Sequence, residues 1–151
     1  MIEIEVEAEG WTKALPEVET VVDIAAKAAL GAVEGQVVVL LADDTVVQDL
    51  NARFRQKDRP TNVLSFPAAE SAFPHLGDIV LGLEYCLTEA EAQGKTIKDH
   101  LSHLVVHGVL HLLGYDHIED DEAEEMEGEE RTILAGLGIA DPYALDEEDA
   151  D

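Results

Sequence analysis

Short apolar runs, separated by glycine, proline and polar residues, predict four strands. In the first run, isoleucine and valine alternate with glutamate, which is the pattern of a strand with one buried face. The second run is almost entirely apolar and largely β-branched, as in a strand buried on both faces. The third stops at Pro67, because proline cannot donate to a ladder of strand hydrogen bonds. The predicted strands span residues 2–6, 36–41, 63–66 and 77–83.

Five further segments carry helical spacing of apolar residues or the signals that begin a helix. Thr88 with Glu91 and Thr96 with Asp99 form capping-box patterns, in which the threonine begins a helix. The first of these two helices is expected to end at Gly94. The last helix carries one apolar stripe, with acidic residues on its other faces. The predicted helices span residues 16–29, 43–50, 88–94, 96–113 and 121–137.

The order of these elements predicts an α+β fold. Strands and helices are mixed along the chain, without an internal repeat or a linker. A chain of 151 residues can form one domain that buries most of its apolar surface. We therefore predict a single domain over residues 1–151, with a mixed sheet of about four strands packed with about five helices. An acidic tail at about residues 144–151 is expected to end it.

The charge of the chain is strongly negative, with one basic exception. The formal net charge is −25, from 34 acidic and 9 basic residues, and such a surface repels bare nucleic acid. Nine of the twelve residues from 119 to 130 are acidic, which is typical of a solvated helix face, with a partner-binding or salt-adapted surface as the alternative. Four of the nine basic residues fall within the basic segment 53–59. This segment offers an anion such as phosphate a positive surface, unless it only forms salt bridges.

Two features favour a cytoplasmic protein. Cys86 is the single cysteine, so no intramolecular disulfide can form, as expected in a reducing compartment. The amino terminus alternates acidic and apolar residues, unlike a signal peptide, and no apolar stretch reaches membrane-spanning length. We expect a protein that is neither secreted nor inserted in a membrane.

Three histidines in the fourth predicted helix and just after it have the spacing of metal ligands. His107 and His111 lie four positions apart, so on a helix they share one face at a distance of about 6 Å. Gly114 can end the helix and let His117 approach the same ion from another direction. Three nitrogen ligands leave one position open, which is typical of one catalytic Zn²⁺ ion, although copper, nickel and iron also accept imidazole. The alternative is a set of hydrogen-bonded histidines without a metal.

This histidine helix is metzincin-like in its spacing. Metzincin peptidases carry a glutamate directly after the first histidine as a general base, whereas this chain has Gly108 there. Peptide hydrolysis by that route therefore lacks a group that it needs. A metallopeptidase stays the least favoured alternative.

Three ordered blocks of sequence resemble the YbeY family of bacterial endoribonucleases, and two shorter segments, 124–127 and 137–143, also match. The blocks are RQKDRPTNVLSFP at 55–67, LGDI at 76–79 and HLVVHGVLHLLGYDH at 103–117. The resemblance implies a zinc-dependent, single-strand-specific endoribonuclease. It also implies a role in ribosomal RNA maturation, notably at the 3′ end of 16S rRNA, and in ribosome quality control. The implied partners are ribosomal RNA and components of the small ribosomal subunit.

Carried over onto this chain, the zinc ligands of the family fall on His107, His111 and His117, and its functional arginine falls on Arg55. Arg59 stands where relatives commonly have another basic residue, so its charge matters more than its identity. The general base stays open. Asp116 beside His117 is one alternative, and attack by the ribose 2′-hydroxyl is another.

Four polar residues near these positions are expected to be structural at least as much as functional. Asn62, Ser65 and Asp78 suit turn and cap hydrogen bonds. His103 shares the ligand face of the helix, but a fourth protein nitrogen would close the open position. We expect His103 to support a ligand or to pack beside it.

A non-enzymatic alternative also follows from the charge. A ribosome-assembly factor with a structural zinc would fit an acidic surface with a single basic segment. The same acidity predicts weak affinity for free RNA in either case.

Overall fold

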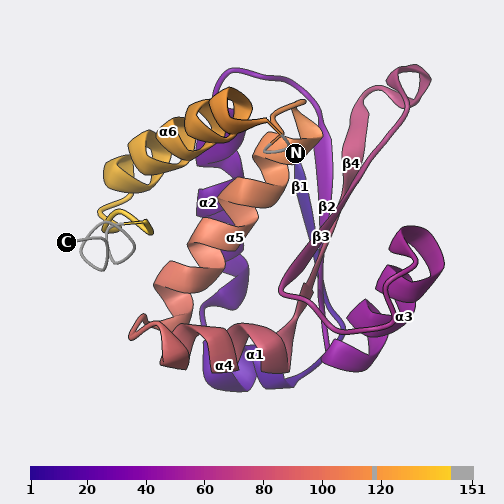
Figure 1. Ribbon diagram of the computed structural model, residues 1–151, viewed down its shortest axis with the longest axis vertical. Coiled ribbons are helices and arrows are strands. Elements are labelled where there is room, and N and C mark those ends of the chain that lie inside the picture. Colours follow the sequence, from indigo (N-terminus) through magenta and orange to yellow (C-terminus); the bar gives the residue numbers. More distant parts are fainter. Residues whose placement is uncertain (117–118, 144–151) are drawn as a thin grey trace.

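A mixed sheet forms the middle of the molecule (Figure 1). The computed structural model describes residues 1–116 and 119–143, and within them the sheet has four strands, as predicted. Their order in space is β1, β2, β4, β3, with β3 at an edge. β1, β2 and β4 run parallel, while β3 runs antiparallel to β4. The strands are β1 (Ile2–Val6), β2 (Gln36–Ala42), β3 (Val63–Pro67) and β4 (His75–Gly82).

Helices cover both faces of this sheet. α2 and α5 lie together on one face, α3 lies on the other, and α6 packs on the outer side of α5 (Figure 1). A short 3₁₀ helix, η1 (Glu70–Ala72), joins β3 to β4. The α helices of the described residues are α1 (Gly10–Ala14), α2 (Val18–Leu30), α3 (Asp44–Arg55), α4 (Leu83–Ala92), α5 (Ile97–Leu112) and α6 (Asp120–Gly136). The predicted α+β architecture is confirmed, with one helix more than the five expected.

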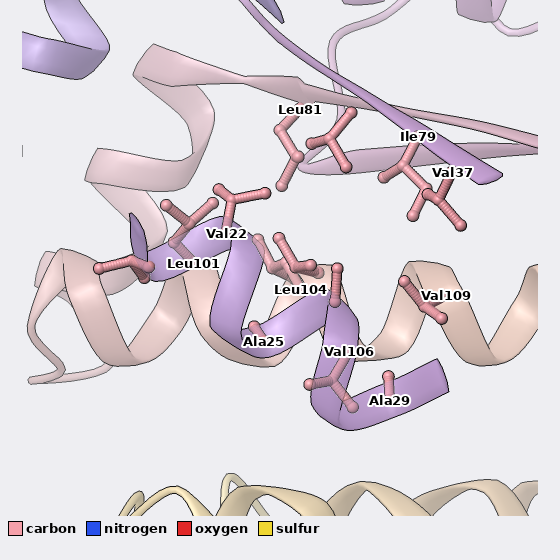
Figure 2. Packing of buried hydrophobic residues seen from close by; sticks show 14 of the residues in the cluster. Val22, Ala25, Ala29, Val37, Ile79, Leu81, Leu101, Leu104, Val106 and Val109 are labelled. Carbon is pink, nitrogen blue, oxygen red and sulfur yellow. The ribbon is translucent and has the colours of Figure 1, made fainter. Parts of the chain in front are cut away.

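The main core lies between the sheet and the two helices that cover it. Alanines of α2 let that helix pack closely on α5, and branched side chains of both helices meet the strands (Figure 2). Because α5 is buried along most of its length, the histidines at its carboxy-terminal end are held by a rigid element. The labelled core residues of Figure 2 are Val22, Ala25, Ala29, Val37, Ile79, Leu81, Leu101, Leu104, Val106 and Val109.

The sequence pattern does not predict α1, because the contact that stabilises this helix is made with a residue far along the chain. It has only five residues, fewer than an isolated helix needs. Trp11 anchors it, because its ring is fully buried and its Nε1 donates a hydrogen bond to the Ala42 carbonyl at 2.8 Å. No local sequence pattern indicates this hydrogen bond.

The predicted start of a helix at Thr88 is wrong. α4 begins at Leu83, so Thr88 and Glu91 lie inside it. The group that caps this helix comes from another element, because the Asp44 side chain at the start of α3 accepts a hydrogen bond from the Tyr85 amide at 3.0 Å. The start of α5 is confirmed, since the Thr96 hydroxyl accepts a hydrogen bond from the Asp99 amide at 3.1 Å.

Replacing Thr96 with alanine is expected to lower the free energy of unfolding by about 1 kcal/mol, because the amide of Asp99 loses its cap. Thr88→Ala is the matched control. It removes another exposed threonine, from inside α4, and we expect a change of at most about 0.5 kcal/mol. Urea unfolding of both variants measures the difference, and equal losses would contradict the assignment of the two helix starts.

No helix within residues 1–116 or 119–143 combines the length and the apolar character that crossing a membrane requires. The predicted acidic tail at about 144–151 lies outside the described residues.

Candidate metal centre

A cleft of about 620 Å³ opens where the carboxy-terminal end of α5 passes the edge strand β3. It brings together three of the residues singled out in the sequence, Arg55, His107 and His111. Asp116 lines it as well, whereas His117 lies outside the described residues. The remaining lining residues are Asn62, Val63, Leu64, Ser65, Pro67, Gly114 and Tyr115.

The two described histidines of the predicted ligand set aim their Nε2 atoms at each other. These nitrogens are 3.2 Å apart, and the two rings are nearly perpendicular, at 83°. Two nitrogen ligands at about 2.0–2.1 Å from a tetrahedral zinc ion stand about 3.3 Å apart. The donor pair therefore fits a shared metal ion.

The other ring nitrogen of His107 contacts Glu130, which sequence reasoning did not single out. Glu130 comes from α6, and its side chain is completely buried. Its carboxylate accepts hydrogen bonds from His107 Nδ1 and from the Tyr143 hydroxyl, and one carboxylate oxygen lies 3.4 Å from His103 Nε2. A buried carboxylate with these partners is fixed in position, and it fixes the ring of His107 in turn.

The hydrogen bonds decide the charge of Glu130. Burial alone raises the pKa of this carboxyl group, but the hydrogen bonds from His103, His107 and Tyr143 outweigh it and lower the pKa to about 2. Burial and the same carboxylate raise the pKa of Tyr143, so its hydroxyl keeps its proton. An ionised Glu130 holds a proton on His107 Nδ1, so the Nε2 lone pair faces His111 and the cleft, where a metal ion can bind.

Glu130 was hidden by its acidic neighbours. The composition of the acidic run 119–130 predicts a solvated face, and this prediction is wrong for Glu130, which is buried. One signal could have found it: Met126, Glu130 and Leu134 are spaced four apart, and all three are buried. A carboxylate in an apolar stripe requires a partner inside the protein.

A second group of possible metal ligands surrounds the same carboxylate. His103, His107 and Glu130 each offer one ligand atom, and these atoms lie within 4.8 Å of one another. The described residues can therefore hold a metal ion on either side of the His107 ring, through Nε2 toward the cleft or through Nδ1 toward Glu130.

The segment that follows α6 holds Tyr143 in place. Arg131 Nε donates to both carboxylate oxygens of Asp141 at 3.1 Å, and the guanidinium lies 5.3 Å from the centre of the Tyr143 ring. Lys95 also donates to the Pro142 carbonyl at 3.2 Å. Residues 137–143, which resemble the YbeY family in sequence, therefore have a structural role: their contacts hold the Tyr143 hydroxyl next to Glu130.

Arg55 reaches the cleft from the last position of α3. Its guanidinium Nη2 donates to the Ser65 carbonyl at 2.7 Å, and its central carbon lies 5.8 Å from the centre of the Phe66 ring. The exposed side chain is thus held at the edge of β3 next to the histidines. Arg59 lies elsewhere, in a neighbouring hollow of about 230 Å³ that Arg55 and Lys57 also line.

The other polar residues make structural hydrogen bonds. Asn62 donates to Glu89 at 2.9 Å, and its side-chain oxygen accepts from the Val63 amide. Ser65 Oγ lies 3.4 Å from the Gly108 carbonyl and joins β3 to α5. His103 lies behind His107, and its Nε2 is 3.4 Å from a Glu130 carboxylate oxygen.

Gly108 faces the sheet and not the cleft. A Cβ atom at this position would meet Ile79 Cδ1 at 3.0 Å and Ile79 Cγ2 at 3.1 Å. The absence of a side chain lets α5 approach β4 closely. A glutamate at this position would point into the core. Replacing Gly108 with glutamate would therefore not give the site the general base of a metzincin.

Comparison with known proteins agrees with the resemblance noted in the sequence. The family described as Endoribonuclease YbeY matches residues 3–138. Endoribonuclease YbeY of Paramagnetospirillum magneticum is 50% identical, over 94% of this chain and 94% of that protein. Its counterpart in Azorhizobium caulinodans is 51% identical, over 95% and 96%. The solution structure of TM1509 from Thermotoga maritima superposes with a TM-score of 0.61 at 32% identity, over 89% of this chain and 87% of that one. A match of this extent shows that the chain belongs to the Endoribonuclease YbeY family.

Proposed function

We propose that this protein is a zinc-dependent endoribonuclease that cuts single-stranded RNA during the maturation of ribosomal RNA. Its proposed target is the 3′ end of 16S rRNA, with a further role in ribosome quality control and with components of the small subunit as partners. The relatives named as endoribonucleases support the reaction class. The observation that carries the proposal is the His107 and His111 nitrogen pair, 3.2 Å apart, in a cleft that Arg55 also lines.

We place the metal ion on the cleft side of His107, with His107, His111 and His117 as its ligands. On the opposite side, the Glu130 carboxylate already accepts hydrogen bonds from His107 Nδ1 and the Tyr143 hydroxyl, so a metal ion there would have to displace them. The cleft side is also where an RNA strand can enter. A zinc ion bound there would supply Lewis acidity, which polarises a phosphoryl oxygen and lowers the pKa of water.

The residues of the chain have separate roles in this proposal. Glu130 holds the proton of His107 on Nδ1 and orients the ring. The Arg55 guanidinium binds the non-bridging oxygens of the scissile phosphate and stabilises the charge that develops on them. Asp116, which lines the cleft, is the proposed general base for attack by water. A 2′,3′-cyclic phosphate on the upstream product would instead assign the attack to the ribose 2′-hydroxyl.

The test is cleavage of a 16S rRNA 3′-end precursor by the zinc-loaded protein beside His111→Ala purified in the same way. Loss of one ligand is expected to remove the metal and to slow cleavage by about 100-fold or more, since metal-assisted charge stabilisation contributes several kcal/mol. His75→Ala is the matched control, because His75 begins β4 outside the residues that line the cleft, and it should cut as the parent does. Equal cleavage by the parent and His111→Ala would point to a contaminating nuclease and reject the proposal.

The charge of the chain favours one second candidate. With a net charge of −25 and a single basic segment, the protein suits docking on a basic ribosomal surface as a non-enzymatic assembly factor. Zinc-loaded protein that sediments with small subunits but cuts neither free nor ribosome-bound precursor would support that function instead.

A further inference from the structure

Within the basic segment 53–59, the aromatic ring of Phe54 is exposed to solvent. Phe54, in the last turn of α3, is 65% exposed, although the packed core lies within reach of the same helix. Its ring meets the half-buried ring of Phe66 in β3 edge to face, with the centres 5.5 Å apart and the planes at 68°. Phe66 in turn packs on the small apolar cluster between α3 and the sheet. Phe66 therefore packs against one part of the Phe54 ring, while most of the Phe54 side chain is exposed to solvent.

Arg55 connects this aromatic pair to the cleft. Its guanidinium lies 5.8 Å from the centre of the Phe66 ring and donates to the carbonyl of Ser65, the residue before Phe66. Ser65 itself points to the opposite face of β3, toward α5 and the histidines. Only the width of the edge strand β3 therefore separates the aromatic pair from the cleft. Arg55, the proposed phosphate-binding residue, lies across this strand, because it contacts Phe66 and also lines the cleft.

The charges around Phe54 indicate which ligand fits this surface. The basic segment 53–59 carries four of the nine basic residues of the chain, and Arg55, Lys57 and Arg59 line the hollow of about 230 Å³ beside the cleft. These positive side chains favour an anionic ligand, although Asp58 lies in the same segment and Arg53 pairs with Asp49. An exposed ring favours a ligand that offers a flat apolar face. Single-stranded nucleic acid has both properties, because each phosphate is followed by a base with an open π face.

We infer that Phe54, supported by Phe66, is a stacking platform for one unpaired nucleobase of the RNA strand that occupies the cleft. The inference rests on the proposed function and adds a subsite to it. The strand passes over Arg55, with the scissile phosphate on the histidine side and the stacked base on the α3 side. A base inside a duplex has both faces covered by its neighbours, so this subsite selects against paired RNA.

The test measures by fluorescence anisotropy how tightly the metal-loaded protein binds RNA at low salt. The probe is a fluorescein-labelled, unstructured decaribonucleotide whose backbone cannot be cleaved. Phe54→Ala is expected to weaken binding by about 10-fold, within the range of about 5- to 150-fold that stacking of one base supports. Phe54→Tyr should restore affinity to within about twofold, whereas Phe54→Leu, which keeps an apolar contact with Phe66, should not. Phe73→Ala is the matched control, since Phe73 is 63% exposed but lies between η1 and β4.

A series of oligonucleotides with one abasic site at each position identifies the stacked base. The parent should lose affinity at one main position, and Phe54→Ala should be indifferent to an abasic site there. Unchanged binding by Phe54→Ala and Phe54→Leu would overturn the platform, as would an equal loss in Phe73→Ala. If the parent still cuts RNA in these cases, the platform alone fails. A parent that neither binds nor cuts RNA rejects the proposed function and the platform together.

Discussion

Replacing Arg55 with alanine is expected to slow RNA cleavage by about 100-fold or more, while the fold and the bound metal are retained. Arg55 is exposed at the end of α3, where it donates a hydrogen bond to the Ser65 carbonyl and contacts the Phe66 ring, so its loss is expected to cost about 1 to 3 kcal/mol of stability and to leave the protein folded. It is outside the proposed ligand set, so zinc content should not change. The cleavage rate at saturating RNA, zinc analysis and thermal melting measure the three effects separately.

Two further variants separate the geometry of Arg55 from its charge. Arg53→Ala removes a neighbouring positive charge whose side chain points to Asp49, with Arg53 Nε 3.1 Å from a carboxylate oxygen, and it should slow cleavage only a few fold. Arg55→Lys keeps the charge but loses the planar fork of donors that matches phosphate oxygens, so we expect an intermediate rate. If Arg53→Ala and Arg55→Ala slowed cleavage equally, Arg55 would only add to the general electrostatic attraction of RNA and would have no specific role at the scissile phosphate.

The sequence predicted those features whose causes are local. Alternation and apolar runs predicted the four strands, and the spacing of His107 and His111 predicted that their nitrogens would meet. The threonine at 96 predicted the start of α5, because the hydroxyl caps an amide only three residues away. In each case the interacting groups lie within a few positions of one another.

Features with distant causes escaped prediction. The start of α4 depends on Asp44, 41 residues before Tyr85, and α1 depends on a hydrogen bond from Trp11 to residue 42. The support of His107 comes from Glu130, 23 residues further on, in a run whose composition indicates a solvated surface. A local pattern describes what a residue can do, whereas these contacts depend on which elements the fold places side by side.

The second large effect is expected for Glu130→Gln. The change keeps the size of the side chain and lets it accept a hydrogen bond from His107 Nδ1, but it removes the charge that holds the proton there. Loss of such a supporting group typically weakens metal binding by about 10- to 100-fold. Competition with a zinc chelator measures the affinity. Cleavage should fall with zinc occupancy and recover in part when zinc is raised.

Glu130 should also give the metal-free protein a pH-dependent component of stability. Its pKa is lowered from 4.5 to about 2, so the ionised carboxylate stabilises the folded state above pH 4.5, and this contribution is lost as the pH falls from 4.5 toward 2. Glutamine cannot titrate, so the difference in unfolding free energy between the parent and Glu130→Gln should be larger at pH 6 than at pH 3.

Glu129→Gln is the control that separates position from charge. It removes the same charge from the preceding residue of α6, whose side chain is exposed, and we expect zinc affinity and acid stability to match those of the parent. If Glu129→Gln weakened zinc binding as much as Glu130→Gln, the effect would come from the acidic surface as a whole. If neither did, the buried carboxylate would be a structural partner of Tyr143 alone, and the His107 ring would be oriented by its packing on α5.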